Sequence, residues 1–124
     1  MGEPLVRTER LNISPLELPA VEALVSGDAA ALERVTGALF PRPVAPPPYM
    51  LETLPIVRER LRLHPGETAW WNWVIVERDT RRAVGSVAFA GRPDVHVSVL
   101  IGYAMYPEFE RHGYATEAVR AMIG

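Results

Sequence analysis

The spacing of apolar positions predicts a strand and two helices in the first third of the chain. Residues 8–14 alternate polar and apolar side chains well enough for a short first strand, which ends at Pro15. Residues 16–25 and 29–39 then carry helical spacing. A Ser-Gly-Asp sequence between them provides a helix stop followed by a new N-cap.

A proline-rich segment separates this region from a third helical stretch. Five prolines fall between residues 41 and 48. Because each proline lacks an N–H and restricts the residue before it, we expect an extended, semi-rigid loop. Residues 51–63 return to helical spacing, with Leu54, Val57 and Leu61 on one stripe, and a His-Pro-Gly sequence ends the helix.

From residue 69 onward the pattern changes to that of a β-sheet. Residues 70–76 are aromatic and β-branched on both alternating faces, which is typical of a strand covered on both sides. Polar turns at 77–82 and 91–94 separate it from two more strands, at 83–90 and 97–105. Three tryptophans fall in this region: Trp70, Trp71 and Trp73. They are predicted to belong to the core, and the alternative is that one of them lines an acceptor pocket.

The last segment combines a strand, a polar loop and a helix. The apolar run ends before Pro107, and apolar residues reappear after Gly113 at helical spacing. A helix start exposes unpaired N–H groups and the positive end of a dipole, and a glycine there lets an anion approach the backbone. We therefore expect a ligand, typically a phosphate, to bind here, with a plain strand-to-helix turn as the alternative.

Composition excludes several classes of protein. The 124 residues fit a single domain covering residues 1–124, and no apolar run approaches the roughly 20 residues that a membrane span requires. The start of the chain lacks a signal-peptide pattern and there is no cysteine, so the cytoplasm is the expected location. A net charge of −2 without a basic block argues against nucleic-acid binding. We expect no metal site, because His64 and His96 lie far apart beside turns and are predicted to be exposed.

Two sequences carry a resemblance to a known family. Residues 83–89 read Ala-Val-Gly-Ser-Val-Ala-Phe, and residues 101–119 read Ile-Gly-Tyr-Ala-Met-Tyr-Pro-Glu-Phe-Glu-Arg-His-Gly-Tyr-Ala-Thr-Glu-Ala-Val. This pattern resembles the GNAT superfamily of N-acetyltransferases, especially the branch that acetylates ribosomal-protein N-termini, and the strongest match covers residues 70–123.

The resemblance implies a fold and a reaction. The fold is α+β, of the three-layer α/β type, with an N-terminal strand, a helical arm, an antiparallel three-strand meander and a cofactor-binding helix. The reaction is transfer of an acetyl group from acetyl-CoA to a primary amine, such as a protein N-terminus, by direct attack in a ternary complex. A non-catalytic CoA-binding or protein-interaction module that retains the fold is the alternative.

The resemblance also assigns the cofactor contacts. The family's phosphate-binding segment has the form Gln or Arg, two residues, Gly, one residue, Gly or Ala, and here it falls on residues 110–115. Gly113 and Ala115 match it, whereas Glu110 does not. A carboxylate repels pyrophosphate, but solvent screens an exposed one, so we expect binding to persist in weakened form. The residues implied at the pyrophosphate are Arg111, His112, Gly113, Tyr114, Ala115 and Thr116, and those implied along the pantetheine arm are Ala104, Met105 and Tyr106.

Alternatives remain for several of these side chains. A solvated or capping role is the alternative for Arg111 and Thr116, and simple exposure is the alternative for His112. Many relatives carry Glu where this chain has Leu100, which cannot accept a proton. Strand alternation puts Tyr106 on the same face as Leu100 and Ala104. If that face lines the cleft, Tyr106 is the candidate catalytic acid, with amphipathic packing as the alternative.

The chain also ends early by comparison with the family. In relatives, the helix after Gly113 leads into a further parallel strand beside the third meander strand. Without that neighbour, a row of N–H and C=O groups would be open on the strand edge. We expect that the chain is truncated at its C-terminus and covers this edge by dimerisation, swapping or partial disorder.

Overall fold

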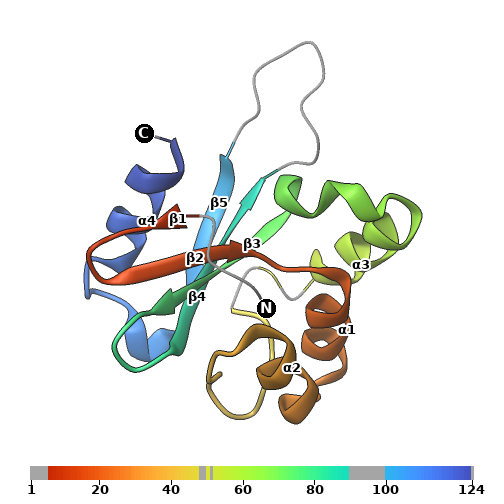
Figure 1. Ribbon diagram of the computed structural model, residues 1–124, viewed down its shortest axis with the longest axis horizontal. Coiled ribbons are helices and arrows are strands. Elements are labelled where there is room, and N and C mark those ends of the chain that lie inside the picture. Colours follow the sequence, from red (N-terminus) through yellow and green to blue (C-terminus); the bar gives the residue numbers. More distant parts are fainter. Residues whose placement is uncertain (1–5, 48–49, 51, 90–99, 124) are drawn as a thin grey trace.

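A single antiparallel sheet with helices on both sides forms the protein (Figure 1). The computed structural model describes residues 6–47, 50, 52–89 and 100–123. The sheet order is β1-β2-β3-β4-β5. In chain order the elements are β1 (Val6–Arg7), β2 (Leu11–Pro15), α1 (Leu18–Ser26), α2 (Ala29–Thr36), α3 (Leu54–Leu63), the 3-10 helix η1 (Pro65–Trp70), β3 (Asn72–Glu77), β4 (Arg82–Phe89), β5 (Leu100–Met105), the 3-10 helix η2 (Pro107–Phe109) and α4 (Tyr114–Ile123).

The predicted first strand, at 8–14, begins later, at Leu11, and the short strand β1 precedes it. Residues 8–10 form a turn between β1 and β2, because the Thr8 amide donates to the Leu11 carbonyl at 2.9 Å and the Leu11 amide donates to the Thr8 hydroxyl at 3.0 Å. Residues 8–10 are all polar, and the alternation of apolar and polar residues begins only at Leu11, where β2 begins. The chain therefore begins, in its described part, with a hairpin whose turn lies near α4 (Figure 1).

The helical arm follows the prediction with shorter elements. Asp28 is the N-cap of α2 as expected, since its carboxylate accepts the Ala31 amide at 3.1 Å. The helix ends at Thr36, before the predicted residue 39, because Gly37 adopts a left-handed φ of 72° and donates to the Glu33 carbonyl at 2.8 Å.

The predicted strand at 70–76 begins later, at Asn72. Trp70 belongs to η1 and Trp71 lies between η1 and β3. Trp73 is buried, so the prediction of a core tryptophan is confirmed for this residue, while the other two are partly buried. Burial on both faces of β3 is confirmed as well, since Val74 and Ile75 are 3% and 0% exposed.

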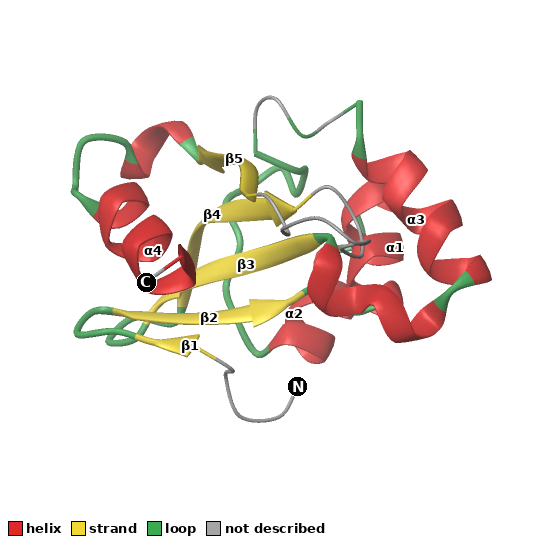
Figure 2. Cartoon of the chain, turned by 90° about the horizontal axis from the view of Figure 1, so that it is seen from above, coloured by secondary structure: helices red, strands yellow, loops and turns green. Residues whose placement is uncertain are grey.

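The predicted meander of β3, β4 and β5 is confirmed. Cross-strand partners share a face, so Val87 with Tyr103 and Gly85 with Met105 face α4, while Ala104 lies on the opposite face. In both views the sheet separates α4 from α1, α2 and α3 (Figure 2). No helix in the described part of the chain has the length and apolar character for a membrane crossing.

Candidate functional site

A shallow groove of about 220 Å³ runs between β5 and α4. Its strand wall is Tyr103, a residue that is 56% exposed. Its helix wall consists of residues from the first two turns of α4: Ala115, Thr116, Val119 and Arg120. The predicted strand edge and the predicted phosphate-binding helix start thus border one surface.

The backbone of Tyr106 is occupied within the chain. Its amide donates to the Val84 carbonyl of β4 at 3.0 Å, and its carbonyl accepts the Phe109 amide of η2 at 2.9 Å. Neither group points to a ligand, so the prediction that the Tyr106 backbone pairs with a pantetheine arm is revised.

Alternation in the β4–β5 ladder then identifies the outward groups. In an antiparallel ladder, residues alternate between those that bond the partner strand and those that point away from it. Because Tyr106 bonds β4, Ala104 does so too, and the N–H and C=O groups of Tyr103 and Met105 point to the open edge of β5. Of the three strand residues that the sequence predicted, only Met105 therefore has outward backbone groups, and Tyr103 is added to it.

The start of α4 presents its amides beside this edge. Gly113 adopts a left-handed φ of 77°, and its carbonyl accepts the Glu117 amide at 3.1 Å, which makes Gly113 the N-cap. The following amides, at Tyr114, Ala115 and Thr116, belong to the first turn and have no acceptor within the helix. Glycine has no side chain to cap them. The geometry therefore suits an anion, as the spacing predicted.

The loop before the helix is solvent-exposed. Glu110, Arg111 and His112 are all exposed, so solvent screens the Glu110 carboxylate, as expected for the residue that departs from the family pattern. His112 Nδ1 donates to the Glu110 carbonyl at 2.8 Å, and the imidazole stacks on the Tyr114 ring with centroids 5.6 Å apart. His112 thus has packing contacts in addition to its exposure.

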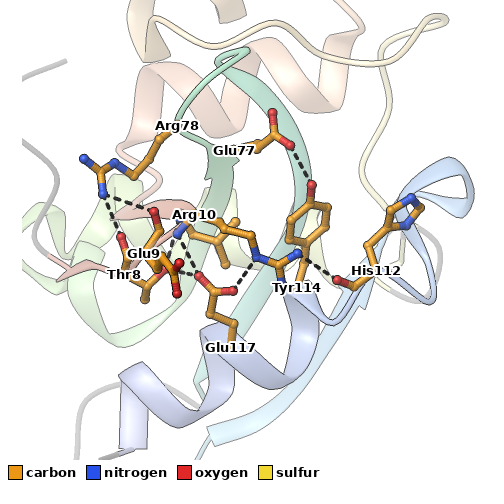
Figure 3. Close-up of polar contacts among 9 residues, drawn as sticks. Thr8, Glu9, Arg10, Glu77, Arg78, His112, Tyr114 and Glu117 are labelled. Carbon is orange, nitrogen blue, oxygen red and sulfur yellow. Dashed lines mark hydrogen bonds and ion pairs between the residues drawn. The ribbon is translucent and has the colours of Figure 1, made fainter.

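Tyr114 anchors the helix start to the sheet (Figure 3). Its side chain is buried and its hydroxyl donates to Glu77 Oε2 at 2.6 Å. The hydrogen bond to Glu77, with burial, raises the pKa of the Tyr114 phenol, and hydrogen bonds from Thr80 and Tyr114 lower the pKa of Glu77. Sequence reasoning assigned Glu77 to a polar turn, and no local spacing signalled this contact across 37 positions.

A second tie joins α4 to the β1–β2 turn. Arg10 Nε and Glu117 Oε1 form an ion pair at 2.7 Å, and the Arg10 amide donates to Glu117 Oε2 at 3.0 Å. Burial opposes ionisation of Glu117, but hydrogen bonds from Thr8 and Arg10 outweigh it and lower its pKa. Arg10 and Glu117 were missed by sequence reasoning, because 107 positions separate them.

The candidate acid Tyr106 is buried on the other face of the sheet. Its hydroxyl donates to the Ala45 carbonyl of the proline-rich segment at 2.8 Å, and burial raises the pKa of the phenol above its ordinary value. A phenol with a raised pKa releases its proton less readily. Its catalytic role stays a prediction, while the packing role has direct contacts.

The histidines contribute no metal site within the described residues. His64 is exposed, as predicted, and His96 lies outside the part of the chain that the structure describes. No cluster of three or more His, Asp or Glu side chains suited to a metal occurs among the described residues.

Comparison with known proteins assigns the family. A family model of the acetyltransferase (GNAT) domain matches residues 10–124. The chain belongs to the GNAT acetyltransferase family. Two uncharacterised N-acetyltransferases of Bacillus subtilis are similar to this GNAT chain. YjdG is 29% identical over 96% of the chain and 70% of its own length, and YoaA is 33% identical over 41% of the chain and 29% of its own length.

Solved structures support the GNAT fold. A GNAT-family acetyltransferase from Bacillus anthracis has a TM-score of 0.54 at 19% identity, covering 95% of the chain and 63% of its own length. A candidate ribosomal-protein-serine acetyltransferase from Vibrio cholerae has a TM-score of 0.54 at 21% identity, covering 98% of the chain and 67% of its own length. The GNAT chain thus spans about two thirds of these structures, and the expected α+β fold is confirmed.

Proposed function

We propose that this GNAT chain carries the acetyl-CoA-binding wall of an N-acetyltransferase that acetylates a primary amine, with protein N-termini as the preferred acceptors. One observation carries the proposal: the open edge of β5 and the first turn of α4 border the same groove. Acetyl-CoA is the cosubstrate of the GNAT family. Its two recognisable parts, an amide-containing arm and a pyrophosphate, match a strand edge and a helix start respectively.

In this proposal β5 binds the pantetheine arm of acetyl-CoA, and α4 binds its pyrophosphate. The outward backbone groups of Tyr103 and Met105 offer strand-like hydrogen bonds to the pantetheine amides. The first-turn amides of α4 offer donors to the pyrophosphate, and the exposed Thr116 hydroxyl adds another. Arg120, which lines the groove and is exposed, adds positive charge nearby.

Direct transfer requires a charge to be stabilised on the thioester oxygen. The attacking amine forms a bond to the thioester carbon, the C–S bond breaks, the amine gives up a proton, and the CoA thiolate accepts one. An outward N–H on β5 is suited to stabilise the oxyanion that develops, and Met105 is the candidate. The Tyr106 hydroxyl donates to the Ala45 carbonyl and is therefore engaged within the chain.

The acceptor class is inferred from a structural neighbour. The protein from Vibrio cholerae is described as a candidate ribosomal-protein-serine acetyltransferase, and its fold covers nearly all of this chain. A thiol-release assay with acetyl-CoA and an acceptor panel tests the inference. With peptides that begin with Ala or Ser as acceptors, the assay should detect free CoA thiol. With small polyamines as acceptors, it should detect none. A folded protein that binds neither CoA nor acetyl-CoA in isothermal titration would refute the proposed function.

A non-catalytic CoA-binding module is the second candidate. It is favoured by the engaged Tyr106 hydroxyl and by Leu100 at a position where relatives carry Glu. The same two experiments separate it from the enzyme. CoA binding without thiol release for every acceptor would favour the module, and turnover with any amine would exclude it.

A further inference from the structure

Arg10 connects three segments at the start of α4 (Figure 3). Its Nε donates to Glu117 Oε1 at 2.7 Å, and its Nη1 donates to the His112 carbonyl at 3.0 Å. The Thr8 hydroxyl donates to the same Glu117 carboxylate. One side chain from the β1–β2 turn therefore holds both the loop before α4 and the first turn of the helix.

The Arg10 guanidinium also packs against the residue that opens the helix. Its carbon lies 4.5 Å from the centroid of the Tyr114 ring, a cation–π distance, and His112 stacks on the same ring at an interplanar angle of 6°. Its Nη2 lies 3.3 Å from where a Cβ on Gly113 would be. Arg10 thus contacts or closely approaches each residue from 112 to 114.

The backbone that Arg10 holds includes one unfavourable conformation. Arg111 has a left-handed φ of 64°, a region that non-glycine residues rarely adopt, whereas the φ of 77° at Gly113 is one that glycine adopts readily. His112 lies between them, and its carbonyl is the group that accepts from Arg10 Nη1. Such conformations persist when surrounding contacts fix them.

We propose that Arg10 is a positioning residue for the phosphate-binding amides of α4, acting through the 110–113 loop without contacting the ligand. The proposal rests on the proposed function for its ligand. Arg10 contacts the side of α4 that carries Tyr114 and Glu117, whereas the groove is lined by other helix residues. Its contribution is to geometry, because its charge is already paired with Glu117.

Substitutions of Arg10 test the proposal by comparing two ligands. Arg10→Ala should weaken CoA binding about tenfold, the scale of one charge-assisted hydrogen bond, and leave binding of acetyl-pantetheine, which has no pyrophosphate, unchanged. Arg10→Lys should not restore CoA affinity, since a point charge cannot hold Glu117 and His112 together. Arg78→Ala is the matched control, because Arg78 Nη1 bonds the Thr8 and Glu9 carbonyls of the same turn.

A ligand-free measurement separates this proposal from the proposed function. Amide hydrogen exchange in a peptide covering residues 110–118 should accelerate in both Arg10 variants and not in Arg78→Ala. If the wild-type protein fails to bind CoA, the proposed function is refuted, and the exchange result still decides whether Arg10 holds the loop. Unchanged exchange in Arg10→Ala, equal losses for both ligands, or full recovery of CoA affinity by Arg10→Lys would overturn the proposal.

Discussion

The Tyr114 hydroxyl donates to the Glu77 carboxylate at 2.6 Å, which ties the first residue of α4 to the last residue of β3. The same tyrosine contributes its amide to the first turn of the helix. Its side chain is buried against the sheet while its backbone belongs to the helix start. The position of the anion-binding amides is therefore coupled to the core.

Tyr114→Phe should destabilise the protein by about 1–3 kcal/mol, because the ring remains while Glu77 loses one donor in a partly buried site. Urea unfolding measures the loss. Tyr103→Phe is the control, since Tyr103 is 56% exposed, and it should leave stability nearly unchanged. Equal stability of Tyr114→Phe and the wild type would show that the bond to Glu77 contributes little.

Gly113→Ala should weaken CoA binding as well as stability. Alanine at a left-handed φ of 77° costs about 1 kcal/mol, and its Cβ would lie 3.3 Å from Arg10 Nη2, so the helix start and the amides that it presents would have to shift. Gly37→Ala is the matched control, because Gly37 has a similar φ of 72° with nothing within 4 Å. Isothermal titration should show about tenfold weaker CoA binding for Gly113→Ala alone. Equal affinities for the two variants would place the ligand elsewhere.

Gly85→Ala should destabilise the sheet by roughly 1–3 kcal/mol, since the added Cβ would lie 2.5 Å from the Ala104 carbonyl oxygen and 2.7 Å from Met105 Cε. Gly102→Ala on the neighbouring strand is the control, because its Cβ would meet nothing within 4 Å. Thermal or urea unfolding compares the two. A neutral Gly85→Ala would contradict the close packing of β4 against β5.

Glu117→Gln should reduce the acid sensitivity of folding. The folded-state pKa of Glu117 is below the ordinary 4.5, so its stabilisation is fully present above that value and is lost as pH falls through the folded pKa. The variant should be less stable than the wild type at pH 7, and the difference should shrink below about pH 4.5. Glu59→Gln is the control, since its side chain is 59% exposed and its ion pair contributes little. A difference that does not vary with pH would contradict the tie to Arg10.

Local sequence patterns were sufficient to predict the main helices and strands and the start of α4. Helical spacing, the Asp28 cap and the glycine before α4 depend on neighbours within a few residues, and the structure has all three. The ends of the elements were less predictable, because Trp70 belongs to a 3-10 helix and residues 8–10 form a turn before β2.

The contacts that hold the site depend on tertiary structure. Arg10 and Glu117 lie 107 positions apart, and Glu77 and Tyr114 lie 37 apart, so no motif spacing could connect them. Likewise, which backbone groups of β5 point outward depends on its register with β4, where Tyr106 bonds Val84. A strand sequence alone does not contain that register.

An NMR titration of the ¹⁵N-labelled protein with CoA tests the central claim most directly. Saturable binding should shift the amide signals of Tyr103 and Met105 on β5 together with those of Tyr114, Ala115 and Thr116 on α4. Tyr103, Ala115 and Thr116 line the groove, Met105 has an outward amide on the same strand edge, and the Tyr114 amide belongs to the first turn of α4. Absence of binding, or shifts confined to residues remote from β5 and α4, would contradict the account.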